Sequence, residues 1–224
     1  MVLIQSLPKI PKEMLKNLLA QKIEFRITGE EFLSKRGIII SNHLDIFDLL
    51  IPLVYLKQPL YLLYDEKALD GNLVSFVQRF SYFYFFSWMS EDKIEKTLLE
   101  LTQNSHLFVF PERMPTKTGV IQPFDLFVFS ILLRVCRKNE LVLIPSGIDG
   151  TFRLSELSSL WELLFHFRKI RIDYHVGQPI SVLESESDEA WLKQEVEKQV
   201  YSLSQHPERR KKGRILIKTS AREL

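Results

Sequence analysis

Short apolar strands alternate with helical segments along most of this chain, and that alternation most constrains its fold. Such alternation favours an α/β fold, in which a mixed, mostly parallel sheet is flanked by helices. The predicted strands cover residues 24–28, 37–40, 60–64, 82–87, 107–110, 141–145 and 170–176. The predicted helices cover residues 47–56, 72–79, 92–103, 124–137, 155–167 and 189–203. A length of 224 residues suits one sizeable domain, so we predict a single domain over residues 1–224.

Both ends of the chain are basic. Residues 1–22 hold an amphipathic stretch, in which apolar side chains recur at helical spacing between lysines. This N-terminal amphipathic helix can pack on the domain, or lie in a membrane interface with its lysines at headgroup level. Residues 204–224 form a basic tail, in which seven basic side chains stand against two acidic ones from residue 207 onward. A solvated tail and a contact with anionic lipid headgroups or phosphate both fit this charge, whereas no binding motif supports nucleic acid.

The apolar content limits how such a protein can meet a membrane. Hydrophobic residues make up 46% of the chain and include sixteen Phe, which can form core or surface that contacts acyl chains. No uninterrupted apolar stretch reaches the roughly 18 residues of a spanning helix, so a lipid enzyme with this sequence would lie against the membrane. The single cysteine, Cys136, excludes an intramolecular disulfide, and its apolar surroundings predict a buried thiol in a reducing, cytoplasmic setting.

The stretch SNHLDIFD carries the strongest chemical signal. His43 falls at a predicted strand-to-helix turn, and Asp48 follows about one helical turn later. An imidazole in this position can abstract a proton, provided that a carboxylate fixes its tautomer and steadies the imidazolium that forms. No serine or cysteine nucleophile is evident beside it. The simplest chemistry is therefore a histidine that activates a hydroxyl group belonging to a substrate.

This stretch also has other interpretations. His43 can be a structural histidine satisfied inside a turn, with Asp48 an ordinary acid on a helix face. A metal site built from His43, Asp45 and Asp48 is a further alternative, although no His-x-x-x-His pair or cysteine cluster supports it. Asp45 is better placed to cap the start of the helix. The chain has no Gly-x-Ser-x-Gly motif of a serine hydrolase and no P-loop.

A second polar stretch, VFPERMPTKTG, runs from residue 109 to residue 119. An apolar strand leads there into a loop that holds Glu112, Arg113, Thr116, Lys117, Thr118 and Gly119. Two cations, two hydroxyls and a glycine can form a phosphate-binding loop, although a polar surface turn has the same composition. Like His43, Glu112 follows a strand end, and sites in α/β sheets lie off the carboxyl ends of strands.

Two later stretches are less informative when each is taken alone. LVLIPSGIDG, residues 141–150, reads as a buried strand that opens into a Pro and Gly turn, which can line the site or serve the fold. YHVGQPI, residues 174–180, reads as a strand that leaves through a Gly-x-Pro turn.

Together these four stretches resemble the motifs of the glycerophospholipid acyltransferase superfamily, the PlsC-like proteins. NHLDIFD resembles its Asn-His, four residues, Asp motif, and FPERMPTKTG resembles its Phe-Pro-Glu-Gly motif. LIPSG and VGQPI resemble its two later motifs. All four occur in the family order, over about residues 24–183. Within the superfamily, PTKTG and PLYLLYDEK are most similar to the bacterial lysophosphatidylethanolamine acyltransferase branch.

The resemblance implies an activity and roles for particular residues. It implies an O-acyltransferase that moves a fatty acyl group from a thioester, acyl-CoA or acyl carrier protein, to the hydroxyl of a lysophospholipid or glycerol phosphate. His43 would be the general base and Asp48 would orient it, while Glu112 would sit in the acceptor-binding loop. No metal or other cofactor is implied. Phospholipid metabolism at a membrane lipid surface, as a peripheral protein on the cytoplasmic face, is the expected setting.

The sequence also departs from the family pattern. Arg113 stands where the family has Gly after the motif glutamate, and the stretch YFYFFSWMSED lacks the family's arginine. Arg79, Arg113 or Lys117, with Thr116, are the candidates to bind the acceptor phosphate instead. Because of these departures, a non-catalytic lipid- or acyl-carrier-binding protein on the same fold is the alternative. The presence of both His43 and Asp48 favours the enzyme, since a protein that only binds lipid has no need of that pair.

Overall fold

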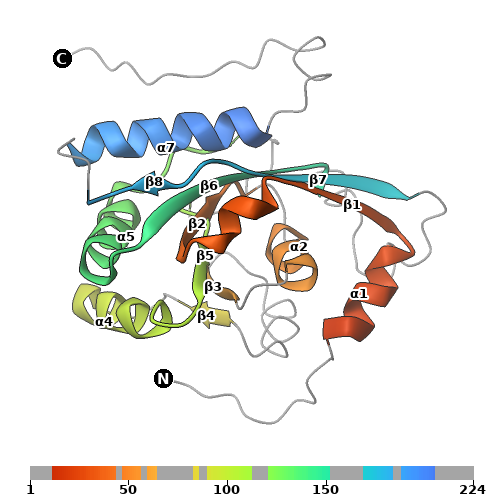
Figure 1. Ribbon diagram of the computed structural model, residues 1–224, viewed down its shortest axis with the longest axis horizontal. Coiled ribbons are helices and arrows are strands. Elements are labelled where there is room, and N and C mark those ends of the chain that lie inside the picture. The colour runs from red at the N-terminus through yellow and green to blue at the C-terminus, as the bar shows by residue number, and fades with distance from the viewer. Residues whose placement is uncertain are drawn as a thin grey trace.

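The computed structural model describes residues 12–43, 47–56, 60–64, 83–85, 90–112, 121–151, 169–183 and 188–204 (Figure 1). The described strands form one sheet and are β1 (Ile23–Thr28), β2 (Gly37–Ser41), β3 (Leu60–Tyr64), β4 (Phe83–Phe85), β5 (His106–Val109), β6 (Val142–Asp149), β7 (Ile170–Val176) and β8 (Ile180–Ser181). The described helices are α1 (Lys12–Ala20), the 3₁₀ helix η1 (Glu30–Ser34), α2 (Phe47–Tyr55), α4 (Glu91–Leu101), α5 (Leu126–Asn139) and α7 (Glu189–Ser204).

The order of strands places β2 at the middle of a parallel region. The order is β1-β7-β6-β2-β5-β3-β4, with β8 beside β6. The strands from β6 through β4 are parallel to one another, whereas β7 runs antiparallel to β6 and pairs in parallel with β1. The predicted mixed, mostly parallel sheet is therefore confirmed. Because β2 and β5 are parallel neighbours, their carboxyl ends meet at one edge of the sheet.

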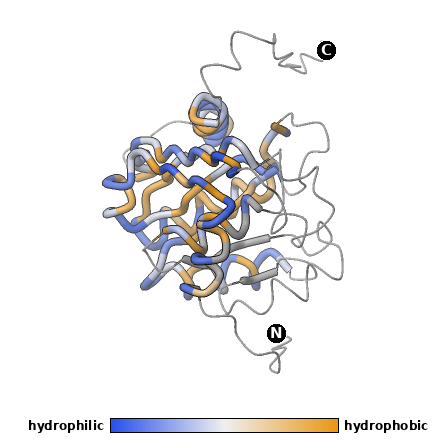
Figure 2. Tube along the Cα trace, turned by 90° about the vertical axis from the view of Figure 1, so that its right-hand side faces the viewer, coloured by the Kyte–Doolittle hydropathy of each residue, from blue (hydrophilic) through white to orange (hydrophobic). Residues whose placement is uncertain are grey.

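Helices cover both faces of the sheet, and the side chains of β2 alternate between two cores. Ile39 belongs to the core cluster that lies under α1 and α2 and includes Leu19 and Ile51. Ile38 and Ile40 belong to the cluster that lies under α4, α5 and α7 (Figure 1). All of β2 is buried, as expected for a central parallel strand covered on both faces. Apolar stretches run through the middle of the described chain in Figure 2, with polar stretches mostly around them.

The predicted turn at Pro145 is wrong, because β6 continues to Asp149. The carbonyl of Pro145 accepts the N–H of Gly177 at 2.8 Å, so the nitrogen of Pro145 also points toward the β7–β8 side. On that side β6 pairs with β8 at residues 142–143 and with β7 at residues 146–149, which leaves Pro145 between the two partners. Its missing N–H therefore falls where the ladder changes partner, and the strand tolerates the proline.

Several predicted elements agree with the structure, and others differ or fall outside it. The strand at residues 170–176 matches β7, and the helix at residues 189–203 matches α7 to within one residue. Neither η1 nor β8 was predicted. The N-cap residue of α4 is Ser90, and its side chain makes no capping hydrogen bond there. The predicted helices at residues 72–79 and 155–167, and the tail from residue 205, lie outside the described residues.

The described part of the N-terminal stretch packs on the domain. α1 occupies residues 12–20 of the predicted amphipathic stretch, with Leu19 buried in the core and Met14 exposed. Cys136 is buried in α5, and burial raises the pKa of its thiol. Across the described segments, no helix combines the length and the apolar sequence that crossing a bilayer would require.

Candidate active site

His43 and Asp48 are placed as the sequence predicts, the first after a strand and the second in the helix that follows. His43 lies two residues beyond the end of β2, and Asp48 lies in the first turn of α2. Both side chains have no exposed surface in this structure. The buried apolar run of β2 thus delivers the histidine to the carboxyl edge of the sheet. The next helix brings a carboxylate into the same buried region.

Glu112 joins this turn from the neighbouring strand. It follows the end of β5 by three residues, and its side chain is buried. Its Oε1 atom accepts the backbone N–H of His43 at 2.8 Å, and its Oε2 atom accepts the backbone N–H of Gln122 at 2.8 Å. The structure therefore brings together the two motif residues His43 and Glu112, which lie 69 positions apart in the sequence.

The ring of His43 is stacked on Phe110. Their centroids lie 4.6 Å apart with an interplanar angle of 28°. Phe110 in turn packs edge-on against Phe108 of β5, with centroids 5.0 Å apart. The imidazole is therefore held by the same segment that carries Glu112. Sequence reasoning missed this contact, although Phe110 belongs to the stretch that drew attention to Glu112.

Asn42 fixes the same turn on its other side. Its Nδ2 atom donates to the carbonyl of Ile148 at 3.0 Å, and its Oδ1 atom accepts the N–H of Ile148 at 2.8 Å. The side-chain amide thus pairs with the main chain of β6 in the way that a strand residue would. The backbone pairing of β2 with β6 ends at Ser41. The side chain of Asn42 extends this contact by one residue, to the position just before His43.

The surroundings of Glu112 disfavour its ionised form. Burial, with a smaller contribution from the nearby carboxylates of Asp48 and Glu197, raises the pKa of Glu112 to about 8, although the N–H groups of Gln122 and His43 act in the opposite direction. Asp48 and Glu112 are therefore close enough for their charges to interact. The two acids compete for the ionised state in one buried region.

Helix α7 closes the far side of this region. Its Tyr201 donates from the phenolic oxygen to the carbonyl of Gln122 at 3.0 Å, and its Glu197 accepts the N–H of Phe124 at 2.7 Å. Burial, with the charges of Glu197 and Glu112, raises the pKa of Tyr201. The segment that supplies the Gln122 N–H to Glu112 is thus itself anchored on α7.

Comparison with known proteins gives a fold relationship. No protein-family model matches the sequence, and no curated protein matches it. The structure is similar to the crystal structure of the 1-acyl-sn-glycerophosphate (LPA) acyltransferase PlsC from Thermotoga maritima, with a TM-score of 0.63 and 16% sequence identity. The match covers 91% of this chain and 80% of that chain. The chain shares the fold of that acyltransferase. This is the fold that the four motifs predict.

Several predicted site residues are not placed. Arg79, Arg113, Thr116 and Lys117 all lie outside the described residues, and so does Asp45. Their proposed contact with an acceptor phosphate therefore stays a prediction. Among the residues that the structure does describe, no group of three or more His, Cys, Asp or Glu side chains is arranged to hold a metal ion.

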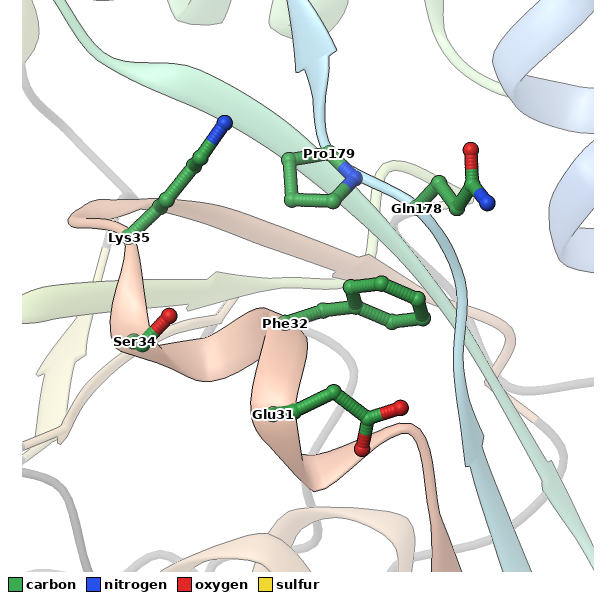
Figure 3. A pocket seen from close by; sticks show the side chains of 6 residues that line it. All are labelled: Glu31, Phe32, Ser34, Lys35, Gln178 and Pro179. Atoms are coloured by element: carbon green, nitrogen blue, oxygen red, sulfur yellow. The ribbon is translucent and has the colours of Figure 1, made fainter.

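A pocket of about 290 Å³ lies elsewhere, at the opposite edge of the sheet. Figure 3 shows its lining side chains, which come from η1, the residues just after it and the β7–β8 connection: Glu31, Phe32, Ser34, Lys35, Gln178 and Pro179. Lys35 precedes β2, whereas His43 follows it, so the length of the strand separates the two. This pocket is not part of the candidate active site.

Proposed function

We propose that this protein is an O-acyltransferase, which moves a fatty acyl group from a thioester to the hydroxyl of a lysophospholipid or glycerol phosphate. The observation that carries the proposal is the hydrogen bond between the His43 N–H and Glu112. It joins two motifs that resemble those of one acyltransferase superfamily, at the edge of the sheet where α/β sites lie. The fold shared with the Thermotoga maritima PlsC acyltransferase supports the same conclusion.

The proposed reaction needs only a base, an oriented alcohol and an activated acyl group. The imidazole of His43 takes the proton of the acceptor hydroxyl while that oxygen attacks the thioester carbonyl. The resulting tetrahedral intermediate then expels the thiolate, which takes the proton from the imidazolium. A new C–O bond replaces the C–S bond, and no oxidant, reductant or metal is required. Asp48 steadies the imidazolium between the two proton transfers.

The structure limits which groups can stabilise the oxyanion. Backbone N–H groups near the His43 turn are suited to this task. The N–H of His43 itself is already donated to Glu112, at 2.8 Å. The oxyanion donors in this proposal are therefore other N–H groups than that of His43.

Burial of the pair adds a requirement for access. Because His43 and Asp48 have no exposed surface, an acceptor hydroxyl reaches the imidazole only after covering side chains move apart. Closure around bound substrates would then exclude water, which strengthens electrostatic interactions and suppresses thioester hydrolysis. The proposal thus includes an opening step before chemistry.

We also propose an acceptor, a donor and a membrane setting for this reaction. The PTKTG and PLYLLYDEK stretches resemble the lysophosphatidylethanolamine acyltransferase branch, which makes lysophosphatidylethanolamine the first acceptor to test. Arg79, Arg113, Thr116 and Lys117 are the proposed contacts for the acceptor phosphate. The donor is acyl-CoA or acyl carrier protein. The membrane surface is reached peripherally from the cytoplasmic face, with the N-terminal stretch and the basic tail as proposed contacts.

An acceptor panel tests the proposal and separates it from its alternative. Protein is incubated with acyl-CoA or acyl carrier protein and with lysophosphatidylethanolamine, lysophosphatidate or glycerol phosphate. Free thiol and acylated lipid are then measured together. Thiol release that depends on an acceptor and matches ester formation supports the enzyme. Lipid binding without thiol release, for every donor and acceptor, would overturn it in favour of a non-catalytic lipid- or acyl-carrier-binding protein.

A further inference from the structure

We propose that Glu112 is a positioning residue: its carboxylate braces the His43 turn against the segment that leads into α5, instead of binding the acceptor. The inference rests on the proposed function, because positioning matters for catalysis only if His43 is the base. It gives Glu112 a different role from the acceptor-loop role that the motif resemblance implies.

Both oxygens of Glu112 are used by the chain itself. Oε1 accepts the N–H of His43 and Oε2 accepts the N–H of Gln122, each at 2.8 Å, within the usual range of an N–H···O hydrogen bond. Glu112 thereby ties three segments together: the turn after β2, its own turn after β5, and the segment before α5. An acceptor headgroup could bind this carboxylate only at the expense of those bonds.

The surroundings of Glu112 favour a brace over a binding group. The side chain is 7% exposed. Negatively charged groups approach it from α2, through Asp48, and from α7, through Glu197. Such a region repels the phosphate of an acceptor, whereas backbone N–H donors offset the cost of a buried carboxylate.

The brace acts on the imidazole through the main chain. The N–H of His43 is held by Glu112, its ring by Phe110, and the preceding residue by the Asn42 pairing with Ile148. Removing one of these supports shifts the base relative to the hydroxyl that it must deprotonate. A displacement of about 1 Å can cost about 10²-fold in rate. The expected loss is in kcat, because the acceptor itself keeps its contacts.

Ionisation strengthens the brace. An ionised carboxyl group accepts both N–H bonds, whereas protonation converts one oxygen into a donor. The titratable groups that face Glu112 are His43, Asp48 from α2, and Glu197 and Tyr201 from α7. With the pKa of Glu112 raised to about 8 by burial, kcat is expected to rise as the pH rises through that region.

The test is a pair of glutamate-to-glutamine variants. Glu112→Gln keeps the shape but can accept only one of the two N–H groups. We expect kcat to fall by about 10²-fold, while KM for the acceptor stays within about threefold and the rise of kcat near pH 8 disappears. Glu95→Gln is the matched control, because it removes a partly buried carboxylate that pairs with Arg134 and Lys138 away from the His43 turn, and it should keep kcat within about threefold. An unchanged kcat with a raised acceptor KM in Glu112→Gln would overturn the brace and support acceptor binding.

A second measurement uses the wild-type protein and needs neither folding of a variant nor activity. The amide protons of His43 and Gln122 are followed by NMR against pH. Because both are bonded to one carboxylate, their chemical shifts should move together with a single midpoint. Separate midpoints, or a shift in only one of them, would overturn the brace. If no acyltransferase activity is found while the two amides titrate together, the proposed function fails but the geometry of the brace stands.

Discussion

Asp48 has a buried carboxylate in the first turn of α2, close enough to Glu112 for their charges to interact. In the proposed mechanism it stabilises the imidazolium that His43 becomes. Asp48→Asn keeps the shape but loses the charge, so we expect kcat to fall by about 10²-fold or more with little change in acceptor KM. Steady-state thiol release measures both constants.

A matched control for that variant lies at the start of another helix. Asp125 is the N-cap of α5 and accepts the N–H of Val128 at 2.9 Å. Asparagine caps helices about as well as aspartate does, so Asp125→Asn should leave kcat nearly unchanged. Equal turnover in Asp48→Asn and wild type would contradict the role given to Asp48.

The raised pKa of Glu112 also predicts how stability depends on pH. In the unfolded chain this carboxyl titrates near its usual value of 4.5, whereas in the folded protein its pKa is about 8. Between those values the folded state holds a proton that the unfolded state releases. The free energy of unfolding should therefore fall as the pH rises from about 4.5 to about 8. Denaturant unfolding at a series of pH values, for wild type and Glu112→Gln, measures this. An identical slope in the two proteins would contradict the assigned pKa.

At the scale of elements, the contact between α7 and β6 depends on a glycine. A Cβ atom on Gly147 would lie 2.3 Å from the backbone nitrogen of Ser204 and 2.4 Å from the carbonyl carbon of Leu203. Gly147→Ala must therefore push the end of α7 away from the sheet. We expect a loss of about 1–3 kcal/mol in the free energy of unfolding, measured by denaturant titration.

A surface substitution on the same helix controls for general effects of mutating α7. Lys198 is 78% exposed and its ion pair with Glu195 spans 3.8 Å, so Lys198→Ala should change stability by no more than about 0.5 kcal/mol. A Gly147→Ala protein as stable as wild type would show that the helix does not pack on β6 as described.

The positions of most described strands and helices could be predicted from the sequence, but the groups that each one pairs with could not. The apolar runs at residues 37–40 and 170–176 predicted β2 and β7 because their patterns are local. Pro145 misled the prediction of β6, because a proline reads as a turn unless it is known that the strand changes partner there. The two N–H groups that bind Glu112 had no signal in the sequence, since any residue but proline can supply a backbone donor.

At the scale of the whole molecule, the sheet explains why residues far apart in sequence meet. The parallel pairing of β2 with β5 brings His43 to Glu112, and α7 anchors the segment that supplies the Gln122 N–H. Alternation of strands and helices predicted the fold class. It could not predict that β1 pairs with β7, because the paired residues, such as Ile23 and Ile170, lie far apart in the sequence. The four motifs in order indicated a resemblance to the acyltransferase superfamily, which hydrophobic periodicity alone could not indicate.

The central claim is that the imidazole of His43 performs the proton transfer. The control histidine is His175, which lies on β7 and bonds to Thr28 away from this turn, so His175→Ala should retain activity. The decisive measurement is acceptor-dependent thiol release by wild type and by His43→Ala, with folding verified by circular dichroism and denaturant unfolding. The account predicts a fall in kcat of about 10²- to 10⁴-fold for a folded His43→Ala protein. A folded variant that turns over at the wild-type rate would contradict it.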